Sequence, residues 1–355
     1  MKIVTGHKLI RLFLAISLFF SAAGLFAAPA GGKFDFNYVL SHHLNDAVVF
    51  EWQIGGTKVR PGDERFEKDP YKRYLFRDDE GVYKWDGGVP MHITKRVMMI
   101  FIACILMLTI FISAARIIAG NPHRINGRFA NAVESLVQFI RVDVVGSMMH
   151  GHGRGFEPYI LTLFFFILFG NLLGLVPPLG EVVEVATIIA TGGEFGHDSQ
   201  PGDTVHLPVG FWPGITYTGD IGVTLPLAAI TAVMIWVTGF RYQGVSFLWS
   251  FLPGGIPKPV VPVLFVILFV LEIIVSPLAK GFALMMRLLA NMTAGHVILL
   301  AIICFIFQFA SWGVVFIAVP GTMAIYFLEI FVGFLQAFLF ALLTTVFIAG
   351  AMHAH

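Results

Sequence analysis

Two apolar stretches near the C-terminus, 260–307 and 314–349, restrict the fold of this chain more than any other feature. A helix needs roughly 20 residues to cross the hydrocarbon core of a bilayer, and both stretches are much longer. Each helix must therefore be tilted, kinked or lie partly in the membrane plane. Because only a short turn joins the two stretches, we predict a long antiparallel helical hairpin within the membrane.

The rest of the chain is typical of a membrane protein with several spans. Of its 355 residues, 57% are hydrophobic, and the net charge of +1 gives no bulk attraction to nucleic acid. Three further apolar runs, 97–115, 158–176 and 221–237, are suited to crossing a membrane. Between the first two, residues 128–148 have the pattern of an amphipathic helix. We predict an all-α polytopic domain over 95–355 with five membrane helices.

The N-terminus has the layout of a secretory signal peptide. Lys2, Lys8 and Arg11 precede an apolar run, and small residues then offer a cleavage site. We predict a cleaved signal peptide over 1–28; the alternative is an uncleaved first membrane helix. Residues 29–94 carry charges of both signs and many Gly and Pro, so we predict a small exported extension of short strands or turns. We assign no metal or cofactor site.

The charges in the loops predict the orientation of the chain in the membrane. Loop 116–157 carries five arginines, whereas loop 177–219 carries acidic residues and no Lys or Arg. Cytoplasmic loops are enriched in Lys and Arg, so the first loop is predicted inside and the second outside. The C-terminus is then cytoplasmic, and the extension and the turn of the hairpin lie outside, in the periplasm of a bacterium whose inner membrane holds the chain.

Arg287 is the main candidate for a functional residue because a charge inside a membrane helix costs at least a few kcal/mol on insertion scales. Ala283, Ala290 and Ala294 share its helix face, with Asn291 one turn on. Such small side chains let another helix approach closely. We predict that Arg287 faces a partner helix with a carboxylate; the alternative is a charge neutralised within its own bundle.

A second candidate site lies inside the hairpin. Glu329 and Gln336 share one face of the last helix and differ in depth by ~10 Å. If Gln336 lies level with Arg287, then Glu329 and His296 lie at one depth, nearer the outside. A histidine beside a carboxylate suits a proton relay, since imidazole titrates near neutral pH and the carboxylate tunes it. The alternative is a structural ion pair.

Three other polar residues receive weaker interpretations. Lys280 is interpreted as a snorkelling or interface charge. Glu272 either lines an inner aqueous vestibule or lies near the cytoplasmic interface. Asn171, near the end of the second run, is interpreted as a residue that hydrogen-bonds between helices.

Several segments resemble the a subunit of F-type ATP synthases. MMRLLANMTAGHVILL is similar to the family signature R-L-x-x-N-x-x-A-G-E/H. GNLLGLVP, TGDIGVTLPLA and FLQAFLFALLTTVFIAGAMH look like its second, third and last membrane segments, and the resemblance covers about 95–352 in the right order. The N-terminal HHLNDAVVFEW is similar to the outer segment of some members.

The resemblance implies a stator subunit with two proton half-channels. Arg287 would meet the carboxylate of a rotor subunit, and Asn291, His296, Glu329 and Gln336 would line the path from outside. The implied partners are a rotor ring of c subunits, the b subunits of a peripheral stalk, the ATP synthase holoenzyme and the lipid bilayer. No segment resembles an ATP site. The exported extension and the long loop 177–219 depart from the commonest members.

A secondary ion-coupled transporter is the alternative from another class. It would predict internal repeats and discontinuous helices around a midplane site. The chain has no such repeat, and its polar residues crowd into one hairpin. An inert membrane anchor would leave Arg287 unexplained. Whether the ion is H⁺ or Na⁺ depends mostly on the rotor.

Overall fold

The computed structural model describes residues 48–54, 66–68, 74–77, 83–85, 89–120, 127–149, 155–176, 214–248, 261–309 and 312–352. The predicted signal peptide and most of loop 177–219 lie outside them. Within this part of the chain, five helices are long and apolar enough to cross a membrane. The predicted all-α polytopic fold is therefore confirmed.

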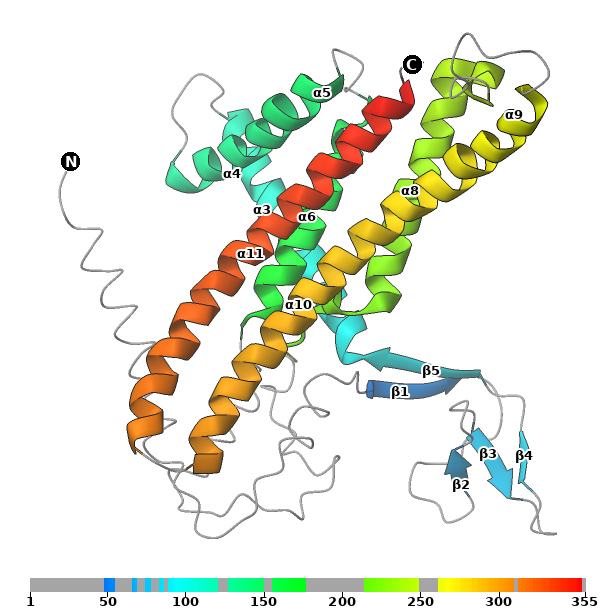
Figure 1. The fold of residues 1–355 in the computed structure, drawn as a ribbon. Helices are drawn as coiled ribbons and strands as arrows, with labels where there is room; N and C mark the ends of the chain where they lie inside the picture. The colour runs from blue at the N-terminus through cyan, green and yellow to red at the C-terminus, as the bar shows by residue number, and fades with distance from the viewer. Residues whose placement is uncertain are drawn as a thin grey trace.

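In the described part of the chain, five short strands precede α3 (Lys95–Gly120). β1 (Val48–Ile54) pairs antiparallel with β5 (Val89–Thr94). β2 (Phe66–Lys68), β3 (Tyr74–Arg77) and β4 (Tyr83–Trp85) form a second antiparallel sheet. Because α3 (Lys95–Gly120) starts at the residue after β5, the strands are held at one end of the helical domain, as Figure 1 shows.

A helical segment follows where we predicted the amphipathic helix. It consists of α4 (Arg128–Gln138), the π-helical η1 (Phe139–Gly146) and α5 (Ser147–Met149). Its Ile140 and Val144 are buried, and the ring of Phe139 stacks on Phe338 at a centroid distance of 5.6 Å. Phe129, near the start of the segment, is 48% exposed. The segment therefore packs against the bundle mainly through its second half.

The core of the bundle surrounds α6 (Glu157–Gly174) and α8 (Ile221–Gln243). Side chains of both helices join those of the hairpin in one buried cluster, which includes Phe164, Ile167, Ile235, Leu284 and Phe340. The side chain of Asp220 caps α8 by accepting from the Gly222 amide, so the helix begins directly after the 3₁₀ turn η4 (Tyr217–Gly219).

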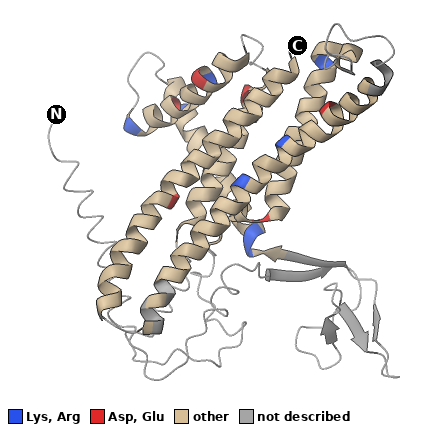
Figure 2. Ribbon diagram, viewed as in Figure 1, with Lys and Arg blue, Asp and Glu red and all other residues tan. Residues whose placement is uncertain are grey.

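The predicted hairpin consists of two long helical segments. The first joins α9 (Val261–Phe269), the π-helical η6 (Val270–Val275) and α10 (Ser276–Phe309). The second is α11 (Trp312–Met352), with 41 residues. The two run side by side, and their turn lies at the end of the domain that also carries the strands (Figure 1). Figure 2 shows that charged residues are sparse along both, so each one needs an explanation.

Candidate functional site

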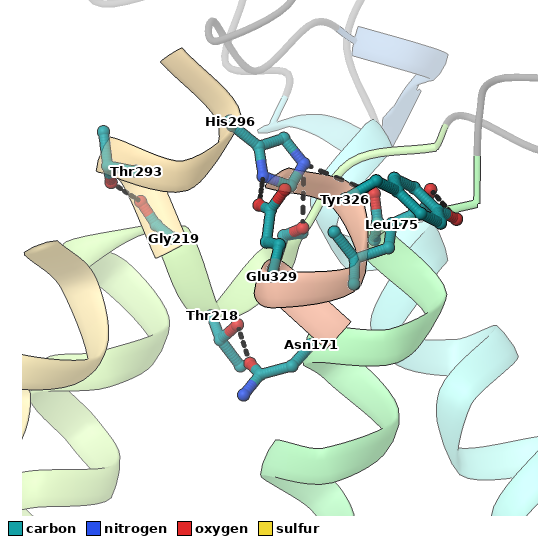
Figure 3. Close-up of polar contacts among 10 residues, drawn as sticks. Asn171, Leu175, Thr218, Gly219, Thr293, His296, Tyr326 and Glu329 are labelled. Carbon is teal, nitrogen blue, oxygen red and sulfur yellow. Dashed lines mark hydrogen bonds and ion pairs between the residues drawn. The ribbon is translucent and has the colours of Figure 1, made fainter. Parts of the chain in front are cut away.

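His296 and Glu329 meet between the two helices of the hairpin. Their Nδ1 and Oε1 atoms are 2.8 Å apart, so the predicted contact is present (Figure 3). The side chain of Glu329 is only 3% exposed. Its Oε2 is buried and has no hydrogen-bond partner in the described part of the chain. One oxygen of the Glu329 carboxyl therefore contacts the imidazole ring, and the other has no hydrogen-bond partner among the described residues.

A glycine makes room for this carboxyl. A Cβ built on Gly295 would lie 2.7 Å from Glu329 Oε1, closer than van der Waals contact permits. The missing side chain lets the Glu329 carboxyl lie directly against α10. Gly295 thus positions the acid beside the neighbouring His296.

The other ring nitrogen faces α6 and the turn before α8. His296 Nε2 lies 3.2 Å from Thr216 Oγ1 and 3.3 Å from the carbonyl oxygen of Gly174. Loop 177–219 enters the described residues at its last part, where Thr216, Tyr217 and Thr218 are buried. This end of the loop packs between α6 and α10 and supplies contacts to the site.

Hydrogen bonds fix the elements around the pair. Asn171 Nδ2 donates to the Gly333 carbonyl at 2.8 Å, and Asn171 Oδ1 accepts from Thr218 Oγ1 at 2.6 Å. The predicted interhelical role of Asn171 is confirmed. Tyr326 donates its hydroxyl to the Leu175 carbonyl at 3.1 Å. These bonds join α6, α11 and the turn before α8. Figure 3 shows the bond between Thr218 and Asn171 below the His296 ring and the bond between Tyr326 and Leu175 beside it.

Arg287 lies half-buried on α10, and no hydrogen bond or ion pair joins it to another described residue. The alanines of its stripe, Ala283, Ala290 and Ala294, are all exposed. On the opposite side, Leu288 is in the core. The described part of the bundle therefore offers no neutralising carboxylate, and the arginine stands on a smooth outer surface.

An open hollow adjoins this surface. It is lined by Met286, Leu289, Ala290 and Thr293 of α10 together with Gly219, Asp220 and Ile221. Asp220 forms an ion pair with Arg96, the second residue of α3. The hollow thus carries a carboxylate at its edge and reaches the alanine stripe beside Arg287.

A family model described as ATP synthase A chain matches residues 97–349. The chain belongs to this family. It is 37% identical over 279 residues to an ATP synthase subunit a 2 of Prosthecochloris aestuarii, covering 76% of this chain and 71% of that protein. It is 33% identical over 344 residues to an ATP synthase subunit a of Pelodictyon phaeoclathratiforme, covering 94% and 81%.

In this member of the family, other residues named from the sequence lie apart from the His296 contact. Gln336 is buried on α11, and no hydrogen bond joins it to another described residue. Glu272 is exposed on η6, where Ser276 Oγ lies 3.5 Å from its Oε1. Lys280 Nζ lies 5.5 Å from the centre of the Phe347 ring, a cation–π distance. No metal-binding cluster occurs among the residues described.

Thr216 and Gly174 were missed by the sequence reasoning. Both touch His296, yet they are 80 and 122 positions away from it along the chain. A weak signal was available. The hydroxyl-rich TYTGD segment directly precedes a helix start, and the family resemblance included its last residues.

Proposed function

We propose that this chain is the stator subunit of the membrane sector of a proton-translocating ATP synthase. The observation that carries the proposal is Arg287, a charge without a partner in the described bundle on an exposed alanine stripe. His296, nine positions on, points to the other side of the helix and contacts Glu329. One helix thus carries a relay on its inner side and an unpaired cation on its outer side.

The mechanism starts with a proton that enters from outside and reaches the pair of His296 and Glu329. From there it passes to a carboxylate on a rotor c subunit. The neutralised carboxyl group can face lipid, which an ionised group cannot do at low cost. After most of a revolution it releases its proton into a separate inner half-channel.

Arg287 separates the two half-channels. A guanidinium is always charged, so it favours the ionised form of the passing rotor carboxylate and cannot itself release a proton. The exposed alanines let the rotor helix come close enough for this contact. We assign Asn291 and Gln336 to the outer path and Glu272 to the wall of the inner half-channel.

The elements at the two ends of the helical domain support one orientation of the chain in the membrane. The strands lie at the end of the domain that holds the hairpin turn, and the C-terminus and α4 lie at the other end (Figure 1). Together with the loop charges, this arrangement supports the proposal that the extension lies in the periplasm and the C-terminus in the cytoplasm of a bacterial inner membrane. The peripheral-stalk b subunits are the second proposed partner. No observation favours the secondary transporter.

Replacement of Arg287 tests the proposal. Arg287→Ala in the assembled complex should abolish ATP synthesis driven by a proton gradient, and Arg287→Lys should also fail, because a compact ammonium does not reproduce the planar guanidinium. Arg116→Ala, which removes an exposed arginine at the end of α3, is the matched control and should keep synthesis. Appreciable coupled synthesis by Arg287→Ala would overturn the proposal.

A further inference from the structure

The two nitrogens of the His296 ring face oxygens of different kinds. Nδ1 faces the carboxyl of Glu329 at 2.8 Å. Nε2 faces the Gly174 carbonyl at 3.3 Å and the Thr216 hydroxyl at 3.2 Å. A carbonyl oxygen can only accept a hydrogen bond, whereas a hydroxyl can accept or donate. Thr216 is thus the one neighbour of Nε2 that can serve the ring in either protonation state.

The protonated ring is satisfied at both nitrogens. Its Nδ1–H donates to Glu329, and its Nε2–H donates to Gly174 O or to the Thr216 oxygen. When the ring loses one proton, two neutral tautomers compete. One keeps the proton on Nε2 and turns the Nδ1 lone pair toward the Glu329 carboxylate. The other keeps the bond to Glu329, but its Nε2 lone pair then needs a donor.

The other hydroxyl groups near the ring are committed elsewhere. Tyr326 donates to the Leu175 carbonyl, and Tyr217 donates to the Phe166 carbonyl at 2.7 Å. Thr218 is bonded to Asn171 at 2.6 Å. Among the described residues, only Thr216 is left to donate to Nε2.

Packing holds the Thr216 hydroxyl in place. The residue is only 6% exposed, and its carbonyl accepts from the Gly219 amide at 3.1 Å. A Cβ built on Gly174 would overlap the Thr216 side chain, so the two residues are in direct contact. The hydroxyl therefore meets the ring from a position that the surrounding backbone fixes.

We propose, on the basis of the proposed function, that Thr216 is a positioning residue that selects the Nδ1–H tautomer of neutral His296. Nε2 is then the nitrogen at which the ring exchanges its proton. On uptake, Nε2 gains a proton from the outer path, and its N–H donates to the Gly174 carbonyl or to the Thr216 oxygen. On release, the Nε2–H bond breaks, the proton passes on toward the rotor carboxylate, and the freed lone pair accepts the Thr216 hydroxyl hydrogen. The Glu329 carboxyl keeps its hydrogen bond with Nδ1–H throughout.

The charged surroundings of the ring are simple enough for a pH test. On α11, Glu329 and Tyr326 are the titratable residues beside it. From α6 and the turn before α8, the described groups that face it are the Gly174 carbonyl and the Thr216 hydroxyl. On α10 itself, Arg287 lies on the opposite side of the helix. A change at Thr216 therefore adds or removes no charge near the ring.

Thr216→Val is the informative variant because it keeps the shape and removes the donor. The protonated ring keeps its Gly174 acceptor, but the neutral ring loses its partner at Nε2. The ring then holds its proton to higher pH. In the reconstituted synthase, the profile of proton conduction against outer pH should move up by roughly 0.5–1 unit, the size of one hydrogen bond. Thr216→Ser, which restores the hydroxyl, should return the profile to that of the wild type.

Thr224→Val is the matched control. Thr224 is also buried, but its hydroxyl bonds only to the Asp220 carbonyl four positions earlier, at 2.9 Å. Its replacement should leave the profile unmoved. If Thr216→Val does not assemble, Thr216→Cys replaces it, since a thiol is a weak donor and should move the profile in the same direction.

A double-mutant cycle separates positioning from structure. Once His296→Ala has removed the ring, Thr216→Val should cause no further change in conduction. An equal loss in both backgrounds, or an unmoved profile in the Val or Cys variant, would overturn the role of Thr216. Wild-type conduction by both His296→Ala and Arg287→Ala would instead overturn the proposed function, so the two failures are distinguishable.

Discussion

At the scale of single residues, the position of the Glu329 carboxyl depends on Gly295, which lies against it on α10 and has no side chain. Gly295 leaves the space in which the carboxyl lies, and Oε1 of that carboxyl reaches His296. Only the residue without a side chain leaves the carboxyl this room. A relay contact of this kind is sensitive to displacements of the size of one methyl group.

Gly295→Ala should therefore reduce proton flux while leaving the helix intact. Its Cβ would push the Glu329 carboxyl away from the ring, and a misplacement of about 1 Å at a reacting group can cost roughly a hundredfold in rate. Flux into vesicles that contain the assembled complex is the measurement. Gly321→Ala, on α11, is the control because a Cβ there meets nothing within 4 Å. Equal flux in both variants would show that the carboxyl does not need this space.

The order of the two residues in the pair should matter less than their contact. His296→Ala and Glu329→Ala should each slow proton entry. The exchanged pair, His296→Glu with Glu329→His, should recover more flux than the sum of the single effects predicts, because a relay needs one group that titrates near neutral pH and a neighbour that tunes it. A double-mutant cycle on flux measures the coupling. Additive effects would mean that the two side chains act independently.

At the scale of elements, α10 divides its surface between two tasks. Leu284, Leu288 and Met292 bury one side in the bundle core, and the alanine stripe leaves the other side smooth. A partner helix can approach such a surface closely only while its side chains stay small. The stripe therefore belongs to the proposed contact with the rotor rather than to the core.

Ala290→Leu and Ala294→Leu should each impair ATP synthesis by holding the rotor helix away from Arg287, with the double variant worse than either. Ala115→Leu, an equally exposed position on α3, is the control and should have little effect. A cysteine at position 290 should cross-link to a cysteine on the rotor helix. Full activity with leucine at both stripe positions would show that the rotor passes elsewhere.

Helical periodicity accounts for the part of the site that could be predicted. The contact between His296 and Glu329 follows from counting residues along two antiparallel helices, and the exposed stripe follows from the spacing of three alanines. Gly174 is the last residue of α6, and Thr216 directly precedes the turn η4; both reach His296 on α10 from distant positions in the sequence. Such contacts depend on tertiary packing and leave no periodic pattern in the sequence.

At the scale of the whole molecule, the strands and the membrane domain are connected through the start of α3. β5 leads directly into this helix, whose second residue, Arg96, is ion-paired with Asp220 at the cap of α8. A displacement of β5 would thus move Arg96 and, through the ion pair, Asp220, which lines the hollow beside the alanine stripe. The start of α3 thus links the end of β5 to the edge of this hollow, although the alanine stripe lies far along the chain from both.

The chain should purify with a ring of small hairpin subunits. Extraction in mild detergent, with an affinity tag on this chain, should bring down the rotor c subunits and the stalk b subunits. The result follows from family membership and from the exposed stripe, which needs a partner to meet Arg287. A tagged chain that comes out alone or as a homo-oligomer under conditions that keep a related synthase intact would contradict the assignment.

The length of the hairpin has a consequence for timing. At about 1.5 Å per residue, the 41 residues of α11 extend about 60 Å, twice the ~30 Å of a hydrocarbon core. To stay inside the membrane, a straight helix of this length would have to lean far from the membrane normal, and α10, which packs along it, would lean with it. If the helix of the proposed rotor partner stands upright, it would cross α10 instead of running along it, and two crossing helices touch only near one point. Each rotor subunit would then be within reach of Arg287 for only a brief fraction of a revolution. Ions would therefore be transferred one at a time, and the number of ions per revolution would equal the number of rotor subunits that pass Arg287.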